Sequence, residues 1–160
     1  MIYDFIDDVG LYVAKTKRGV CFIGADYDEL IAFYEKKYKN EEFRRSAEFS
    51  REAEDLKAYF NGEKISFDWP LDFSVGDFTE SVFKALREIP YGVTSSYSEI
   101  ATQIGNPKAV RAVGRAIGSN PILIAIPCHR VIGKSGKLTG YRGGLPLKEQ
   151  LLKLENRQRS

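Results

Sequence analysis

Two short helical patterns in the second half of the chain, separated by a tight turn, limit the possible fold more than any other feature of the sequence. Ser96 and Glu99 have the spacing of a capping box and predict the start of a helix that ends at Gly105. A second helix is expected over residues 106–118, because Asn is a good cap and Pro suits the first helical position. Two short helices joined in this way are typical of a helix-turn-helix.

The second of these helices has two contrasting sides. At about 100° per residue, its apolar side chains fall on one side and its cations on the other. The apolar set is Val110, Val113 and Ile117, the cationic set is Lys108, Arg111 and Arg115, and alanines, among them Ala112, lie beside the cations. A helix with so little bulk beside its cations could approach DNA closely and place arginines on phosphates or in a groove. The pattern alone fits an ordinary solvated amphipathic helix equally well.

Composition narrows the range of functions. The 160 residues carry a formal net charge of only +2, so any nucleic-acid surface must be local. No apolar run approaches the roughly 20 residues of a membrane span, and the first residues are acidic, unlike a secretory signal. Two distant cysteines, Cys21 and Cys128, predict a reducing, cytoplasmic location without disulfides. With a single histidine in addition, the chain cannot fill a structural zinc site, and we expect no metal and no cofactor.

The first half of the chain predicts a small α/β domain that contains a β-hairpin or sheet. The expected elements are strands at 11–14 and 20–23, a helix after Asp26 with Leu30, Phe33 and Tyr34 on one face, a helix at Ser50–Phe60, and a short strand at 64–67. Residues 69–76 contain Pro and Gly and are interpreted as a connection, which gives domains at 1–75 and 76–160. Cys21 and Trp69 are interpreted as packing residues.

The rest of the second half predicts a winged helix-turn-helix. The expected elements are a helix from Asp77 to near Pro90, a strand after the apolar run Ile122–Ile126, a hairpin of 131–132 and 138–139 around Gly133–Gly136, and a helix from Pro146 to near Glu155. A basic hairpin beside a helix-turn-helix is the wing of a winged-helix domain. The predicted fold class is therefore α+β, with a small N-terminal α/β domain followed by a C-terminal winged helix-turn-helix domain.

Cys128 and His129 are the candidates for covalent chemistry. A thiol attacks as its thiolate and needs a nearby base or positive charge, and His129 is the only histidine in the chain. Adjacent side chains in a strand point in opposite directions, so a link between the two requires a bridging water or a local turn. Glu155 could hold the imidazole as a third member. A lone histidine in an apolar run is, however, more often a structural residue.

The run Ile126–Ile132 resembles the active-site signature of the O6-alkylguanine-DNA alkyltransferases, also called methylated-DNA–protein-cysteine methyltransferases. The resemblance continues with ordered spacing through residues 105–114, 119–121, 140–145, 148–149 and 151–152. It covers about half of the chain, from near Phe78 to Glu155. The first 75 residues carry no comparable signature and are assigned only as the usual N-terminal domain of the family.

The resemblance implies a monomeric DNA repair protein that takes an alkyl group from O6 of guanine in double-stranded DNA, once per molecule. Cys128 would be the acceptor thiolate, His129 would take its proton through water, and Glu155 would orient His129. Asn120 would hold the turn between the recognition helix and the active-site strand, since a short polar side chain can bond to local backbone. Tyr141 would donate a proton or a hydrogen bond to the guanine as it leaves.

The resemblance also implies how DNA is held. Tyr97 would contact a phosphate and help rotate the damaged nucleotide out of the duplex, and Arg111 on the helix-turn-helix, in the minor groove, would fill the gap. Further DNA contacts are expected at Lys108, Ala112 and Arg115, and the alkyl pocket is expected to be lined by Pro127, Val131, Leu138 and Gly143. Arg142 departs from the small or hydroxylated residue of some family members, and the extra Cys and His of zinc-binding members are absent.

Three other interpretations compete with this one. Alkyltransferase-like proteins are non-catalytic sensors that bind the same lesion, but they lack the acceptor thiol that Cys128 supplies. A papain-like cysteine hydrolase needs a histidine far from its cysteine in sequence, and no separate histidine exists here. A winged-helix transcription regulator would explain the cationic helix and the hairpin, but not Cys128 and His129 together with Tyr141 and Glu155.

Overall fold

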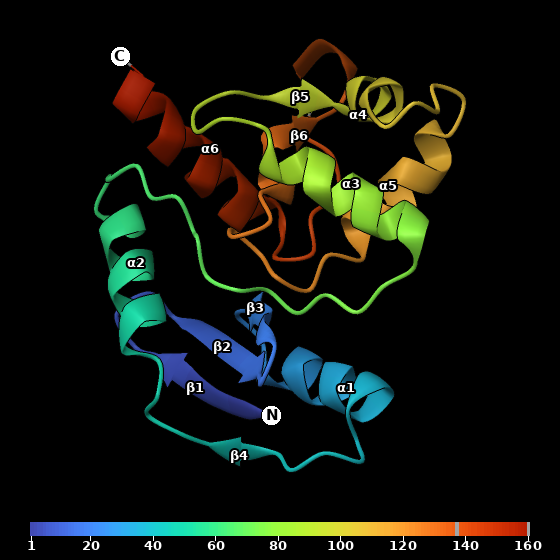
Figure 1. The fold of residues 1–160 in the computed structure, drawn as a ribbon. Coiled ribbons are helices and arrows are strands. Elements are labelled where there is room, and N and C mark those ends of the chain that lie inside the picture. The colour runs from blue at the N-terminus through green and yellow to red at the C-terminus, as the bar shows by residue number, and fades with distance from the viewer. Residues whose placement is uncertain (137, 160) are drawn as a thin grey trace. The chain divides into compact units, whose positions relative to one another are not determined.

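The computed structural model describes residues 1–136 and 138–159, and the chain folds as two compact units (Figure 1). The first unit is Met1–Phe73, and the second begins at Ser74. Within the described residues, no helix is both long enough and apolar enough to cross a membrane.

A four-stranded sheet organises the first unit, in the order β3-β2-β1-β4. Its strands are β1 (Ile2–Ile6), β2 (Leu11–Thr16), β3 (Gly19–Gly24) and β4 (Arg44–Arg45). β2 is antiparallel to both β1 and β3, and β4 pairs in parallel with β1. The sequence predicts β2 and β3. It gives little sign of β1, in which only Ile6 is buried, or of β4, which consists of two exposed arginines.

Two helices complete this unit, α1 (Tyr27–Lys37) and α2 (Ser50–Phe60), and both are as predicted. Asp26 caps α1 by accepting a hydrogen bond from the backbone N–H of Asp28 at 2.8 Å. The cluster that joins α1 to the sheet consists of Ala14, Cys21, Phe22, Leu30 and Phe33. Cys21 is therefore a core residue, as predicted, and burial raises the pKa of its thiol to about 12.

Residues 64–67 form no strand, so the prediction of a short strand there is wrong. The Phe67 ring instead packs edge-on against buried Trp69, with 5.0 Å between the ring centroids. Burial of the aromatic side chains takes precedence over the alternating pattern that indicated a strand. The pairing with the sheet occurs further along, where Leu71 bridges in parallel to Val20.

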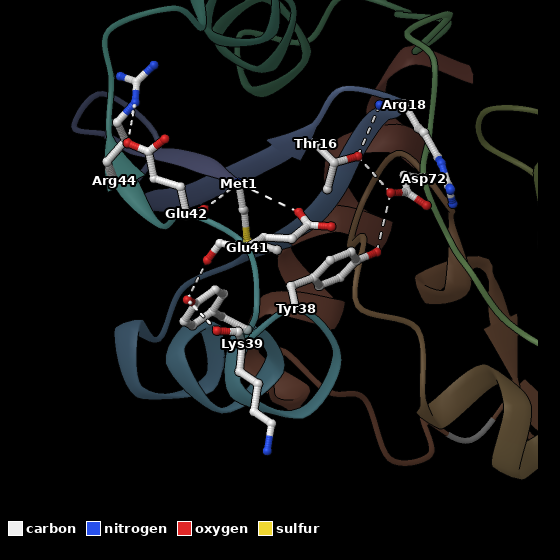
Figure 2. Close-up of polar contacts among 10 residues, drawn as sticks. Met1, Thr16, Arg18, Tyr38, Lys39, Glu41, Glu42, Arg44 and Asp72 are labelled. Carbon is white, nitrogen blue, oxygen red and sulfur yellow. Dashed lines mark hydrogen bonds and ion pairs between the residues drawn. The ribbon is translucent and has the colours of Figure 1, made fainter.

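The connection can run so close to the sheet because Gly19 has no side chain. A Cβ on this residue, whose φ is +148°, would lie 2.2 Å from the carbonyl oxygen of Pro70. Asp72 then anchors the segment by accepting hydrogen bonds from the hydroxyls of Thr16 at 2.7 Å and Tyr38 at 3.3 Å (Figure 2).

The second unit is built from helices and two short strands (Figure 1). They are α3 (Asp77–Arg87), β5 (Ser95–Ser96), α4 (Tyr97–Gln103), α5 (Val110–Gly118), β6 (Val131–Ile132) and α6 (Leu145–Arg159). α3, α4 and α5 pack on one another, and β5 pairs in parallel with β6. Buried side chains from four of the helices form the core: Val82, Phe83, Leu86, Ile100, Val113, Ile117 and Leu151.

The helix-turn-helix forms from α4 and α5, with one correction to the predicted start of α5. Ser96 caps α4 as predicted, since its hydroxyl accepts from the Glu99 N–H at 3.1 Å. α5 begins at Val110 rather than at residues 106–107, because the Asn106 carbonyl accepts from Ala109 N–H and closes a separate turn. Lys108 therefore lies in that turn and not on α5.

The segment that carries Cys128 differs more from the prediction. Cys128–Arg130 form one turn of 3-10 helix, here η1, instead of continuing a strand. The predicted wing hairpin is also wrong in its details: Lys134–Gly136 form a second 3-10 turn, and Leu138 and Thr139 lie in no strand, while residue 137 is outside the described residues. β6 pairs with β5 and so takes its partner from the residues before α4.

Candidate active site

The side chain of Asn120 holds the turn that leads to Cys128. Asn120 follows α5 and is fully buried. Its Oδ1 accepts from the Ile122 N–H at 2.9 Å, and its Nδ2 donates to the Ile126 carbonyl at 2.9 Å and to the Cys128 sulfur at 3.1 Å. One amide group thus fixes both ends of the turn and supplies a hydrogen bond to the sulfur. The predicted role of Asn120 in this turn has a direct geometric basis, and the contact with the sulfur extends it.

The turn itself is strained. Ile124 has a φ of +72°, a conformation in which a β-branched residue is an outlier. Such strain costs about 1–3 kcal/mol and persists only where the surroundings impose it. Here the surroundings are the Asn120 hydrogen bonds, the burial of the apolar side chains, and the bond from Ile126 N–H to the Ile122 carbonyl at 3.1 Å. The turn therefore holds Cys128 in a fixed position at the cost of local backbone strain.

Cys128 is a buried thiol that needs help to ionise. Burial raises its pKa to about 11, while the hydrogen bond from Asn120 and the charges of Lys148 and Arg142 act in the opposite direction. At neutral pH the resting group is therefore a thiol. A base must accept its proton before the sulfur can act as a nucleophile.

His129, Glu155 and Arg130 form a buried cluster next to this thiol. His129 Nε2 lies 2.6 Å from Glu155 Oε2. Arg130 donates from Nε to Glu155 Oε1 at 2.8 Å, from Nη2 to Oε2 at 3.2 Å, and from Nη1 to the Ile89 carbonyl at 2.7 Å. Although burial opposes ionisation, the hydrogen bonds and charges of His129 and Arg130 lower the pKa of Glu155 to about 2. Glu155 is therefore an anion throughout the physiological pH range.

The ionised Glu155 decides which ring nitrogen of His129 carries the proton. A carboxylate can only accept, so Nε2 of His129 is the donor in the short bond. Burial lowers the pKa of His129, which leaves the ring neutral with its lone pair on Nδ1. Nδ1 is buried and has no hydrogen-bond partner within the part of the chain that the structure describes. This atom can accept a proton.

Tyr141 contributes a second unpartnered polar atom. Its hydroxyl is buried and finds no partner among the described residues. Burial, together with the negative charges of Cys128 and Glu155, raises the pKa of Tyr141 well above its ordinary value, so the group is a neutral donor. A Cβ on Gly143 would lie 2.8 Å from the Tyr141 ring, which shows how closely the backbone there supports the ring.

The sequence of this chain matches a known protein family. The family model described as the DNA-binding domain of 6-O-methylguanine DNA methyltransferase matches residues 77–157. This chain belongs to that family. The methylated-DNA–protein-cysteine methyltransferase of Methanosarcina acetivorans is 60% identical over 117 residues, which cover 73% of this chain and 72% of that protein. An inducible relative of the same name from Bacillus subtilis is 43% identical over 157 residues, covering 96% of this chain and 88% of the relative.

Solved structures of the family share the fold. The Mycobacterium tuberculosis protein OGT in complex with DNA superposes with a TM-score of 0.83 at 42% identity, covering 98% of this chain and 92% of that one. The O6-methylguanine-DNA methyltransferase of Pyrococcus kodakaraensis has a TM-score of 0.71 at 23% identity, covering 91% of each chain. At this identity the comparison shows a shared fold and nothing more. The predicted α+β class with a winged helix-turn-helix domain is confirmed.

The residues expected to contact DNA lie on the helix-turn-helix of this family domain. Arg111 and Arg115 project from α5 and are exposed, Lys108 is exposed in the preceding turn, and Ala112 is half-buried. Within the described residues, none of the three cations forms an ion pair. Tyr97, at the start of α4, bonds through its hydroxyl to Thr139 Oγ1 at 2.6 Å.

The expected pocket residues occupy the same unit. Pro127 and Val131 flank η1 and are buried, while Leu138 and Gly143 are half-buried. No group of three or more potential His, Cys, Asp or Glu metal ligands occurs among the described residues.

Neither Arg130, which belongs to this cluster, nor Lys148, which lies on α6, is a candidate from the sequence alone. Arg130 lies within the signature run Ile126–Ile132, which gives it no individual role. Lys148 is fully buried on α6, and its ammonium donates to the carbonyls of Val131 at 2.7 Å and Thr139 at 3.3 Å. A signal was available, because Lys148 falls three residues before Leu151 and seven before Glu155, on the inward stripe of its helix.

Proposed function

We propose that this protein repairs DNA by transferring an alkyl group from O6 of guanine to the sulfur of Cys128, once per molecule. The observation that carries the proposal is the buried relay around one thiol: an Asn120 donor on the sulfur, and a His129 base polarised by ionised Glu155. Membership of the methyltransferase family supports the same reaction. Double-stranded DNA that contains O6-alkylguanine is the partner, and the relatives' DNA complex supports it.

The first step activates the sulfur. The Cys128 proton passes to Nδ1 of His129, through a water molecule, and the imidazolium that forms is stabilised by Glu155. Arg130 keeps Glu155 ionised and fixed in place. The Asn120 amide stabilises the thiolate by donating to it.

The second step is a displacement at the alkyl carbon. The sulfur–carbon bond forms as the carbon–O6 bond breaks, and the electron pair leaves with the guanine. Guanine is a poor leaving group as an anion, so the neutral Tyr141 hydroxyl donates a proton or a hydrogen bond to it. The product on Cys128 is a thioether, which no group in the site can cleave. The protein is therefore consumed in the reaction.

Reaction at a buried sulfur requires the damaged nucleotide to leave the duplex. Flipping costs a few kcal/mol, and less for a mispaired alkylated base. α5 would enter the minor groove, where Arg111 fills the gap and Tyr97 contacts a phosphate. Lys108 and Arg115 would meet further phosphates, and half-buried Ala112 permits close approach. Pro127, Val131, Leu138 and Gly143 would line the alkyl pocket.

The alternative in the same family context is a non-catalytic sensor of alkylated DNA. The sensor interpretation leaves the strained turn, the Asn120–sulfur bond and the His129 lone pair without purpose.

The low cysteine count supports the proposal that this protein is cytoplasmic. We also propose that it acts as a monomer.

Titration with an oligonucleotide that carries labelled O6-methylguanine tests the proposed function. We expect label to accumulate on the protein and stop at one equivalent, whereas continued turnover would contradict the mechanism. Cys128→Ser should accept no label and still bind the duplex. Cys21→Ser is the matched control, because that thiol lies in the core of the other unit, and loss of transfer in this variant alone would refute the site.

A further inference from the structure

Lys148 is a buried charge without a permanent counter-ion. Its side chain is 1% exposed. The hydrogen-bond acceptors of its ammonium are the carbonyls of Val131 and Thr139, which are neutral, and no carboxylate within the described residues pairs with it. A buried ammonium is costly unless a negative charge compensates it. The two carbonyls hold the ammonium in place, but because they are neutral they leave its charge uncompensated.

The position of Lys148 relates it to the nucleophile. Val131, which accepts its shorter bond, comes directly after the 3-10 turn that contains Cys128. Thr139, which accepts the other, leads to Tyr141 and bonds through its own hydroxyl to Tyr97. The ammonium thus joins the segment that follows the Cys128 turn to the segment that leads to Tyr141.

The electrostatic effects between the two groups are reciprocal. The charge of Lys148 lowers the pKa of Cys128 against the larger effect of burial, and the thiolate in turn raises the pKa of Lys148, which burial lowers. The charge of Arg130, by contrast, is already compensated by Glu155. The negative charge that Lys148 lacks is the one that Cys128 acquires when it is activated.

We propose that the Lys148 ammonium is the counter-charge of the Cys128 thiolate and acts as a positioning residue for the transfer reaction. It stabilises the sulfur anion between loss of the proton to His129 and attack on the alkyl carbon. Alkylation removes this anion, because the thioether is neutral, and leaves the ammonium uncompensated. The inference rests on the proposed function, since it requires Cys128 to be the acceptor.

The pH dependence of transfer from free O6-benzylguanine, followed by intact mass, tests the inference without DNA. In Lys148→Met, the rise of rate with pH should move to higher pH by at least about one unit, with a loss of about tenfold near pH 7 that closes in alkaline solution. Lys148→Arg should restore most of the wild-type profile, because it keeps the charge. The matched control is Lys153→Met, which removes an exposed charge from the same helix and should overlay the wild type.

A Lys148→Met profile that is lowered at every pH but unshifted would overturn the inference and leave only a structural role. Should that variant fail to fold by circular dichroism, Lys148→Gln decides instead, because it removes the charge and keeps a donor for the carbonyls. Its rate profile should shift to higher pH in the same way, and an unshifted profile would refute the counter-charge. Absence of any transfer from O6-methylguanine DNA to wild-type Cys128 would overturn the proposed function itself, so the two failures are distinguishable.

Discussion

Single atoms with unused hydrogen-bonding capacity mark the chemistry of this site. The Tyr141 hydroxyl and Nδ1 of His129 are buried polar atoms without partners among the described residues. Leaving such a group unpaired costs about 1–3 kcal/mol, so each is explained by something that binds or reacts there. In the proposed reaction, Nδ1 accepts a proton and the hydroxyl supplies one.

Tyr141→Phe separates chemistry from stability at one atom. The variant removes a buried hydroxyl that has no partner among the described residues, so the free energy of unfolding should not fall and should rise by up to about 1–3 kcal/mol. The rate of transfer from O6-methylguanine DNA should fall by about 100-fold, because the leaving guanine loses its donor. Urea unfolding and single-turnover kinetics measure the two quantities. A variant that reacts at the wild-type rate would show that Tyr141 is not the donor.

Part of the residue-level site could be predicted from the sequence. Cys128, His129 and Glu155 were found through their chemistry and the family signature, and the structure brings His129 and Glu155 into contact. The Asn120–sulfur bond and the partnership of Arg130 with Glu155 could not be predicted, because they depend on side-chain positions across a turn and between segments far apart in sequence.

At the scale of elements, long periodic segments were predictable and short ones were not. α2 has the predicted bounds, and the Ser96 cap fixes the start of α4. The 3-10 turn at Cys128–Arg130 was predicted as a strand, since a short apolar run does not distinguish the two. The prediction of a wing hairpin was wrong because strands of two residues carry no periodic signal. The actual partner of β6 is β5, which lies far away in the sequence.

The exposed arginines of α5 are expected to act on DNA and not on the transfer reaction itself. Arg111→Ala should lower the rate of repair of duplex DNA by roughly tenfold or more, because the extruded nucleotide loses the group that fills its place. Transfer from free O6-benzylguanine should be unchanged, since no extrusion is needed. Arg115→Ala, one turn along α5, is the control for simple loss of a phosphate contact and should weaken binding with a smaller effect on the rate. Equal losses on both substrates for Arg111→Ala would exclude a flipping role.

At the scale of the molecule, the second unit contains every residue of the proposed site. The first unit shares the fold of solved relatives but supplies none of the proposed catalytic groups. The buried charge cluster of the second unit links its stability to pH. Glu155 has a pKa of about 2 in the folded protein against an ordinary value of 4.5, and the pKa of His129 is lowered from 6.5.

Both shifts predict loss of stability in acid. A group whose pKa is depressed by folding contributes stability above its unfolded pKa and loses it as pH falls towards its folded pKa. The His129 contribution should decline below about pH 6.5, and the Glu155 contribution, on the order of 3 kcal/mol, between about pH 4.5 and 2. Urea unfolding followed by far-UV circular dichroism checks this, with Glu149→Gln on the exposed face of α6 as a control that should keep the same pH dependence. Stability that is flat from pH 7 to 3 would contradict the charge assignments.

Intact-mass measurement after exposure to excess O6-methylguanine duplex, followed by peptide mapping, tests the central claim most directly. We expect a gain of one methyl group per chain, located on the peptide that contains Cys128, with Cys21 unmodified. Disappearance of the lesion while Cys128 remains unmodified would contradict it.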